Sequence, residues 1–291
     1  MRVPQVSIEA SVTLNCAGKL LDLSSPRVMG ILNVTPDSFS DGGKFFSPAN
    51  AVAQALSMQE EGAAIVDVGG ESTRPGAQAI SVDEELRRVI PVIEAAAKVL
   101  TIPISIDTTK PEVMKAAISA GAGFINDVMA LRAPGALRAA AECGVPVCLM
   151  HMQGKPNTMQ NSPEYADVPD EVKSFLLGRL RQCLDAGIPR DFIMLDPGIG
   201  FGKKLQHNLQ LLRNLDSLLA LGQPIMVGAS RKSMIGALLG DRPVADRVSG
   251  SVAAALFAAT RGAKLIRAHD VGATADALRI WQSLGTSAYK D

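Results

Sequence analysis

The chain has 291 residues, the usual size of one eight-stranded α/β barrel and enough to bury a large core. With 29 basic and 29 acidic residues its formal net charge is zero, which argues against a nucleic-acid-binding surface. The four cysteines form no CxxC pair and there are only three histidines, so a zinc site is not expected. No apolar stretch reaches the ~18 residues that span a bilayer, and the N-terminus lacks a signal-peptide pattern. We therefore expect a cytoplasmic protein that binds neither nucleic acid nor membrane.

Residues 1–27 precede the repeating part of the chain. The runs at 12–14 and 20–23, joined through Ala17-Gly18, predict a hairpin that covers the bottom of a barrel. From Val28 onward, short β-branched runs alternate with Ala/Leu-rich amphipathic stretches. The predicted strands are 28–32, 65–68, 104–106, 124–125, 147–150, 192–195, 225–227 and 264–266.

Helices are predicted between these strands and after the last one. Their ranges are 48–61, 83–100, 111–120, 135–143, 169–186, 205–221, 232–261 (broken near Arg242-Pro243) and 273–284. Alternation of this kind implies a parallel sheet, and eight repeats favour closure. The predicted fold class is α/β, a (β/α)8 TIM barrel with a short N-terminal β-hairpin, formed by a single domain over residues 1–291.

Three strand-to-helix connections are long, at residues 33–46, 69–82 and 151–167, whereas the helix-to-strand links are short. Long loops in compact domains are usually functional, and this fold builds its active site from the strand-to-helix loops. The loop 33–46 combines turn formers with Asp37, Asp41 and phenylalanines, a composition suited to closing over a substrate.

Every predicted strand ends in polar or charged side chains. In chain order these are Asn33, Asp67, Asp107, Asn126-Asp127, His151, Asp196, Ser230-Arg231-Lys232-Ser233, and Arg267 with His269. Helix capping explains one or two such residues but not all eight positions. The pattern predicts a small-molecule site at one rim of the barrel.

The chemistry of this rim divides into two groups. Asp107, Asn126, Asp196 and Lys232 supply donors and acceptors suited to a flat heterocycle rich in N–H and C=O groups, although each aspartate alone is equally compatible with a salt bridge or a cap. Arg267, His269 and Arg74, with Asn33, suit a phosphate near strands seven and eight, although His269 alone is also compatible with a neutral structural histidine.

A glycine-rich segment at 198–203, GIGFGK, lacks both GxGxxG spacing and the P-loop pattern. We therefore expect a tight turn there that lets a ligand approach the backbone.

Eight motifs together resemble the dihydropteroate synthase family, and the resemblance covers nearly the whole chain from about Leu21. They are MGILNVTPDSFSDGG (29–43), DVGGESTRPGA (67–77), SIDT (105–108), IND (125–127), CLMHMQG (148–154), LDPGIGFGK (195–203), GASRKSMIG (228–236) and RAHDV (267–271). Their order and spacing match the family along the chain.

This resemblance implies a reaction and a set of contacts. The family joins 6-hydroxymethyl-7,8-dihydropterin diphosphate to p-aminobenzoate and releases diphosphate with the help of Mg²⁺. The resemblance assigns the pterin to Asp107, Asn126, Asp196 and Lys232, with Arg267 against its ring. It places Thr73, Arg74, Arg267, His269 and Asn33 around the diphosphate, with Asn33 also on the metal, and Pro75, Phe39, Phe201 and Ser233 near the aminobenzoate. It also implies a homodimer formed through the last helices.

Two other functions stay open from the sequence. One is a corrinoid-linked methyltransferase with a similar pterin-binding barrel, which has no use for a diphosphate site. The other is a barrel that binds pterin or phosphate without catalysis.

Overall fold

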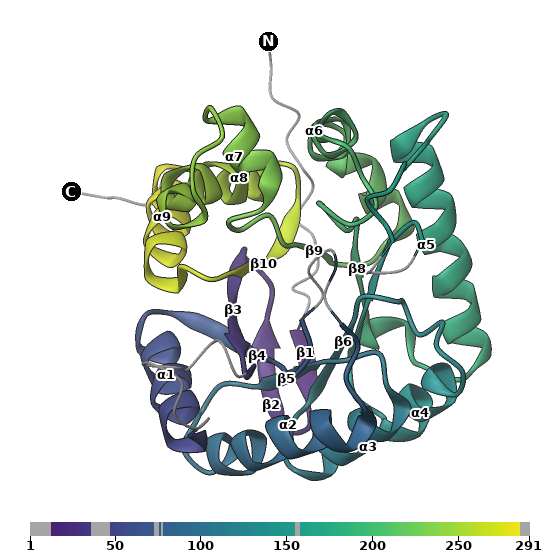
Figure 1. The fold of residues 1–291 in the computed structure, drawn as a ribbon, viewed down its shortest axis with the longest axis vertical. Coiled ribbons are helices and arrows are strands. Elements are labelled where there is room, and N and C mark those ends of the chain that lie inside the picture. Colours follow the sequence, from purple (N-terminus) through teal and green to yellow (C-terminus); the bar gives the residue numbers. More distant parts are fainter. Residues whose placement is uncertain (1–12, 36–46, 73–75, 77, 155–157, 286–291) are drawn as a thin grey trace.

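Eight parallel strands close into a barrel in the order β10-β3-β4-β5-β6-β7-β8-β9 (Figure 1). The computed structural model describes residues 13–35, 47–72, 76, 78–154 and 158–285. The barrel strands are β3 (Arg27–Asn33), β4 (Ala63–Gly69), β5 (Ile104–Asp107), β6 (Phe124–Asp127), β7 (Val147–Met150), β8 (Ile193–Asp196), β9 (Ile225–Val227) and β10 (Ala263–Ala268). The predicted (β/α)8 fold and all eight strands are thereby confirmed.

Helices surround the barrel as an outer layer (Figure 1). They are α1 (Pro48–Glu60), α2 (Val82–Ala97), α3 (Pro111–Ser119), α4 (Ala136–Cys143), α5 (Val168–Asp185), α6 (Leu205–Arg213), α7 (Ser233–Leu238), α8 (Val248–Thr260) and α9 (Val271–Gly285). Short 3₁₀ segments occur at η2 (Arg190–Phe192), η3 (Leu215–Leu221) and η4 (Val244–Arg247). Within the described part of the chain, no helix is both long and apolar enough to cross a membrane.

Two predicted helices are interrupted. The break near Arg242-Pro243 is confirmed, because α7 ends before it and α8 begins after η4. The prediction of one helix over 205–221 is wrong, since α6 stops at Arg213 and η3 follows. At the junction, the Asn214 side chain donates to the Gln210 carbonyl over 2.9 Å and the Asn214 backbone leaves helical geometry. An asparagine that bonds its own backbone in this way competes with helix continuation.

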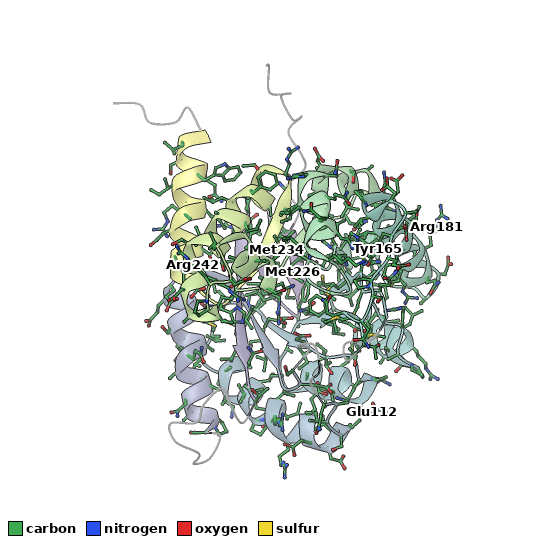
Figure 2. The ribbon with its side chains drawn as sticks, turned by 45° about the horizontal axis from the view of Figure 1, so that its top comes forward. Glu112, Tyr165, Arg181, Met226, Met234 and Arg242 are labelled. Carbon is green, nitrogen blue, oxygen red and sulfur yellow. The ribbon has the colours of Figure 1, made fainter. Side chains whose placement is uncertain are left out.

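Side chains alternate along each strand between the inside of the barrel and the surrounding helices. The outward positions form one large apolar cluster with the helices. The inward positions near the strand starts form a second cluster that includes Met29, Ile65, Phe124, Cys148, Met194, Met226 and Leu265. In Figure 2, Met226 lies near the middle of the molecule, whereas Arg181 projects from the outer helix α5. The residue two positions after each of these inward side chains also faces the barrel interior, and it lies nearer the carboxyl end of the strand.

A hairpin closes the start of the barrel, as predicted. It consists of β1 (Thr13–Cys16) and β2 (Lys19–Asp22), paired antiparallel. Its Leu14 and Leu21 belong to the inner apolar cluster and are almost fully buried. The hairpin also packs closely on Gly123, the residue before β6, where a Cβ atom would overlap the carbonyl of Cys16. With this end filled, the carboxyl ends of the strands are left for a ligand.

Candidate active site

Polar side chains replace the apolar ones at the carboxyl ends of the strands, on the same inward face. Asp67 follows Ile65 by two residues, Asn126 follows Phe124, Asp196 follows Met194 and Arg267 follows Leu265. Asp67, Asn126 and Asp196 are buried. We call Asn33, Asp67, Asp107, Asn126, Asp196, Arg267 and His269 the polar ring. Strand geometry therefore brings together most of the site residues that the sequence predicted.

Arg267 lies between two carboxylates of the ring. Its Nε donates to Oδ2 of Asp67 over 2.6 Å, and its Nη2 donates to Oδ2 of Asp107 over 2.7 Å. Burial raises the pKa of Asp107 to about 7 against the attraction of Arg267, and the neighbouring charge of Asp67 adds to this rise. Burial acts to lower the pKa of the Arg267 guanidinium, but the two carboxylates raise it overall. Arg267 is thus a cation held in place by two carboxyl groups, those of Asp67 and Asp107.

Asp196 occupies another side of the ring, and Lys232 lies near it. Oδ1 of Asp196 accepts the Gly198 backbone N–H over 2.6 Å. The Lys232 ammonium donates to the carbonyl of Ile199 and lies 4.4 Å from the centre of the Phe201 ring. Burial raises the pKa of Asp196 and lowers that of Lys232 to about 8, while the attraction between the two groups opposes both shifts. An acceptor, a donor and an aromatic face meet here, as a flat polar heterocycle requires.

The segment 198–203 is a tight turn packed against the chain after β7. Gly198 and Gly202 both have positive φ, and a Cβ atom at either would overlap the backbone of residues 151–153. The buried Lys203 ammonium fixes this turn by donating to the carbonyls of Gly198 and Phe201, each over 2.9 Å. Glycine is therefore needed for close packing of chain on chain, and the turn carries Phe201 toward Lys232.

Two residues placed on the rim by the sequence face away from it. His151 and Asp127 have the outward parity of their strands. His151 packs edge-on against Phe175 of α5, and its Nδ1 lies 2.8 Å from the Lys203 ammonium. Burial, then Lys203, lowers the pKa of His151 to about 2, so the ring is neutral. Asp127 accepts the backbone N–H groups of Met129 and Leu131. The prediction that these two side chains join the polar rim was wrong, because it ignored strand alternation.

The anion side of the ring is described in part. Ser230 Oγ lies 3.1 Å from Nδ1 of His269 and accepts the His269 backbone N–H over 3.1 Å, which links the ends of β9 and β10. Arg231 forms an ion pair with Asp270. Thr73 and Arg74, predicted at the diphosphate, lie outside the described residues, as do Asp37, Phe39, Asp41 and Pro75. Of the residues predicted near the aminobenzoate, Phe201 lies in the site and Ser233 is exposed at the start of α7.

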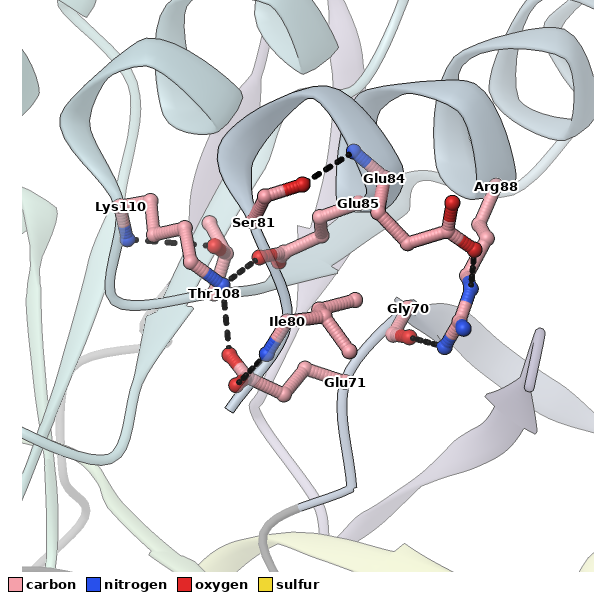
Figure 3. A network of polar contacts seen from close by, with 9 residues as sticks. All are labelled: Gly70, Glu71, Ile80, Ser81, Glu84, Glu85, Arg88, Thr108 and Lys110. Atoms are coloured by element: carbon pink, nitrogen blue, oxygen red, sulfur yellow. Dashed lines mark hydrogen bonds and ion pairs between the residues drawn. The ribbon is translucent and has the colours of Figure 1, made fainter. Parts of the chain in front are cut away.

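An ion-pair network ties both ends of the β4–α2 connection to the barrel (Figure 3). The Lys110 ammonium donates to Oε2 of Glu71 over 2.7 Å and to the fully buried carboxylate of Glu85. The other oxygen of Glu71, Oε1, accepts the Ile80 backbone N–H over 3.0 Å. One carboxylate therefore joins residues 71 and 80, and Lys110 fastens them to α2.

Three structural contributors were missed from the sequence. Asp67 ends a predicted strand, Lys203 ends the GIGFGK segment and Lys110 precedes a predicted helix, but the sequence predicts no role in the site for any of the three. Strand alternation could have indicated Asp67, because it lies two residues after the inward-facing Ile65. Nothing local could have indicated the two lysines, whose partners lie 52 and 25 residues away in the chain.

Oxygen atoms suited to a magnesium ion lie at the ends of β3 and β5. Among the described residues, no group of three or more His, Cys, Asp and Glu side chains could hold a metal ion. Asn33 ends β3 beside Gly69, and a Cβ atom at Gly69 would lie 3.9 Å from the Asn33 amide oxygen and 3.8 Å from Oδ2 of Asp107. Mg²⁺ commonly takes one or two protein oxygens and completes its shell with substrate phosphates and water. The donor set matches that mode of binding.

Comparison with known proteins agrees with this chemistry. The family described as pterin binding enzyme matches residues 29–269. Dihydropteroate synthase of Escherichia coli K12 is 55% identical over 263 residues, covering 90% of this chain and 93% of the relative. The structure of Xanthomonas albilineans dihydropteroate synthase with 4-aminobenzoic acid superposes with a TM-score of 0.91 at 55% identity, covering 95% of this chain and 99% of that one.

A second structure of the Xanthomonas albilineans enzyme is in complex with 7,8-dihydropteroate. It superposes with a TM-score of 0.86 at 52% identity, covering 94% of this chain and 99% of the other. Relatives of this kind match about nine-tenths of the chain. The chain therefore belongs to the pterin-binding enzyme family and, within it, to the dihydropteroate synthases, which are transferases of folate biosynthesis.

Proposed function

We propose that the polar ring condenses 6-hydroxymethyl-7,8-dihydropterin diphosphate with p-aminobenzoate, giving 7,8-dihydropteroate and diphosphate. The observation that carries this proposal is the coexistence, at one rim, of buried carboxylates on the inward face and of Arg267 and His269 at the end of β10. One part suits an aminopyrimidine and the other an anion. A substrate with a heterocycle and a diphosphate uses both.

The pterin is assigned to Asp196, Asp107, Asn126 and Lys232. One oxygen of Asp196 already accepts the Gly198 N–H, and each carboxylate oxygen has a second lone pair for a ligand donor. The Lys232 ammonium faces a ligand carbonyl best as a cation, and its lowered pKa leaves it charged at neutral pH. Phe201, next to Lys232, supplies an apolar wall for a flat ring.

The diphosphate is assigned to Arg267, His269, Thr73 and Arg74. Asn33 and the phosphate oxygens would hold Mg²⁺, which when bound offsets negative charge on the leaving group. The C–O bond to the diphosphate breaks with its electron pair leaving on oxygen, and the reduced pterin delocalises the positive charge left on the methylene. Arg267 and His269 stabilise the anion as it forms.

The aminobenzoate is assigned to Phe201, Ser233, Phe39 and Pro75. Its nitrogen forms the new C–N bond to the methylene and then loses a proton, which the released diphosphate accepts. An aromatic amine is neutral at pH 7, so attack needs no strong general base. The loops at 33–46 and 69–82 are assigned the task of keeping water from the reactive carbon, with Asp37 or Asp41 near it.

The protein is further proposed to be a homodimer formed through its last helices. Large apolar side chains are exposed on all three of them, Leu238 of α7 at 53%, Phe257 of α8 at 39% and Ile280 of α9 at 61%. Sedimentation analysis of the wild type and of an Ile280→Asp variant tests this. A dimer that the substitution weakens is expected, and a wild-type monomer at micromolar concentration would contradict the proposal.

The reaction is tested by measuring diphosphate release from the pterin diphosphate with Mg²⁺, in the presence and absence of p-aminobenzoate. Release that depends on p-aminobenzoate is expected. A folded protein that binds the pterin but releases no diphosphate would instead be a non-catalytic binding barrel. Methyl transfer from a methylated folate to a corrinoid would point to the methyltransferase alternative.

A further inference from the structure

Asp67 is the most deeply buried carboxylate of the polar ring, and the proposed reaction gives it no contact with substrate. Its side chain is fully buried, on the inward face of β4. Its Oδ2 accepts two donors at once, Nε of Arg267 over 2.6 Å and Nδ2 of Asn126 over 3.0 Å. These donors come from β10 and β6, on either side of β4 around the barrel.

We infer that Asp67 is a positioning residue for the condensation: it fixes the Arg267 guanidinium and turns the Asn126 amide so that its oxygen is presented to the pterin. The inference rests on the proposed function and adds a role to that same site. It rests on the shared oxygen Oδ2, which accepts hydrogen bonds from both Asn126, assigned to the pterin, and Arg267.

The orientation of Asn126 follows from the chemistry of its partner. Oδ2 of Asp67 accepts the Nε–H of Arg267, and an oxygen acting as an acceptor takes a second hydrogen bond only from another donor, so Asn126 turns its NH₂ group toward Asp67. The amide oxygen Oδ1 of Asn126 then points elsewhere, and no donor from the described residues meets it. An acceptor oxygen held in this way recognises a ligand N–H and rejects a carbonyl.

The orientation of Arg267 follows from two bonds on one edge of its guanidinium. Asp67 takes Nε and Asp107 takes Nη2, which leaves Nη1 and the flat face for ligands, since no acceptor in the described chain meets Nη1. The family resemblance places the guanidinium face against the pterin ring, and the proposed function uses the N–H groups for the diphosphate. Asp107 is assigned to the pterin as well, so Asp67 is the one carboxylate of the pair that serves Arg267 without also serving the ligand.

The second oxygen of Asp67 supports a role beyond stability. Oδ1 is buried and has no hydrogen-bond partner in the described structure. Leaving a buried polar atom unpaired is unfavourable, so a residue chosen only for stability would not be expected to keep a carboxylate there. Asparagine fits the same space, but it replaces one acceptor oxygen by a donor and removes the charge that holds Arg267.

Isothermal titration with 6-hydroxymethyl-7,8-dihydropterin tests the inference on Asp67→Asn, Asn126→Ala and the double variant. We expect Asp67→Asn to raise Kd at least tenfold. In the Asn126→Ala background the same substitution should raise Kd by a clearly smaller factor, because part of its effect passes through Asn126. Equal factors in the two backgrounds, or an unchanged Kd for folded Asp67→Asn, would overturn the inference.

Asp127→Asn is the matched control. Asp127 is also fully buried and adjoins Asn126, but it faces outward and accepts backbone N–H groups. We expect it to lower the melting temperature and to leave the pterin Kd within about twofold. If Asp127→Asn weakens pterin binding as much as Asp67→Asn at a similar loss of stability, Asp67 has only a structural role.

A measurement on the wild type covers the case in which Asp67→Asn does not fold. In protein labelled with ¹⁵N-arginine, the Nε–H resonance of Arg267, assigned with Arg267→Lys, is expected to exchange slowly with solvent and to stay protected when the pterin binds. Rapid exchange in the complex would overturn the inference. These readouts measure binding, so a failure of p-aminobenzoate-dependent diphosphate release in the wild type would be seen separately, as a failure of the proposed function.

Discussion

Replacing Lys110 by methionine removes the cation that faces Glu85, a carboxylate with 0% exposure. Lys110 itself is 18% exposed and also pairs with the 20% exposed Glu71. Removing one partner of a buried pair destabilises a protein by about 3–5 kcal/mol, because the other charge is left without compensation. Because Lys110 keeps some contact with water, we expect a loss at the lower end of this range, about 3 kcal/mol.

Lys115→Met is the matched control, since it makes the same substitution at an ion pair on the surface. Lys115 and its partner Glu142 are 52% and 42% exposed, and solvent-exposed pairs of this kind contribute little to stability. Urea unfolding followed by the fluorescence of the single tryptophan, Trp281, measures both variants. Adding Glu85→Gln to Lys110→Met should recover much of the loss. Equal stability of the two single variants, or no recovery in the double variant, would refute the reasoning.

Two further predictions concern the ligand site and the closed end of the barrel. Burial lowers the pKa of Lys232 to about 8, so its ammonium form is lost above that pH. Pterin affinity should therefore decrease at alkaline pH, with a limiting slope of about tenfold per pH unit, whereas the affinity of Lys232→Arg should not decrease over the same range. If isothermal titration gives parallel pH profiles for the two proteins, Lys232 is not the cause. Gly123→Ala places a Cβ atom against the Cys16 carbonyl and should destabilise the protein by about 1–3 kcal/mol, measured by calorimetric melting. The kcat at 25 °C should stay unchanged. An unaltered melting temperature would contradict the close packing of the hairpin.

The strands could be predicted because each is a short apolar run whose position in the repeat is fixed by its neighbours. Several strands continue one residue into polar sequence, as β5 does at Asp107 and β8 at Asp196, since a polar side chain can join the ladder when it faces the interior. The break after α6 was missed because it depends on the bond from Asn214 to Gln210, which hydrophobic periodicity does not report.

The polar ring could be predicted in most of its members because parallel strands bring their carboxyl ends to one rim. The errors at His151 and Asp127 came from counting polar residues after each strand without their parity. The positions of Arg267 and Asp67 relative to each other could not be predicted, because 200 residues separate them and only barrel closure pairs β10 with β3, the neighbour of β4. The same holds for Lys110, whose importance depends on the burial of Glu85.

The central claim is that one part of the ring holds the heterocycle and another holds the diphosphate. Isothermal titration of 6-hydroxymethyl-7,8-dihydropterin and of its diphosphate into Asp196→Asn and His269→Ala tests it most directly. Loss of a hydrogen bond to a charged group corresponds to about 1.5–3 kcal/mol, or roughly 10- to 150-fold in Kd. The account predicts that Asp196→Asn weakens both ligands by a common factor in this range and that His269→Ala weakens only the diphosphate. Unchanged pterin binding in Asp196→Asn, or equal weakening of both ligands in His269→Ala, would contradict it.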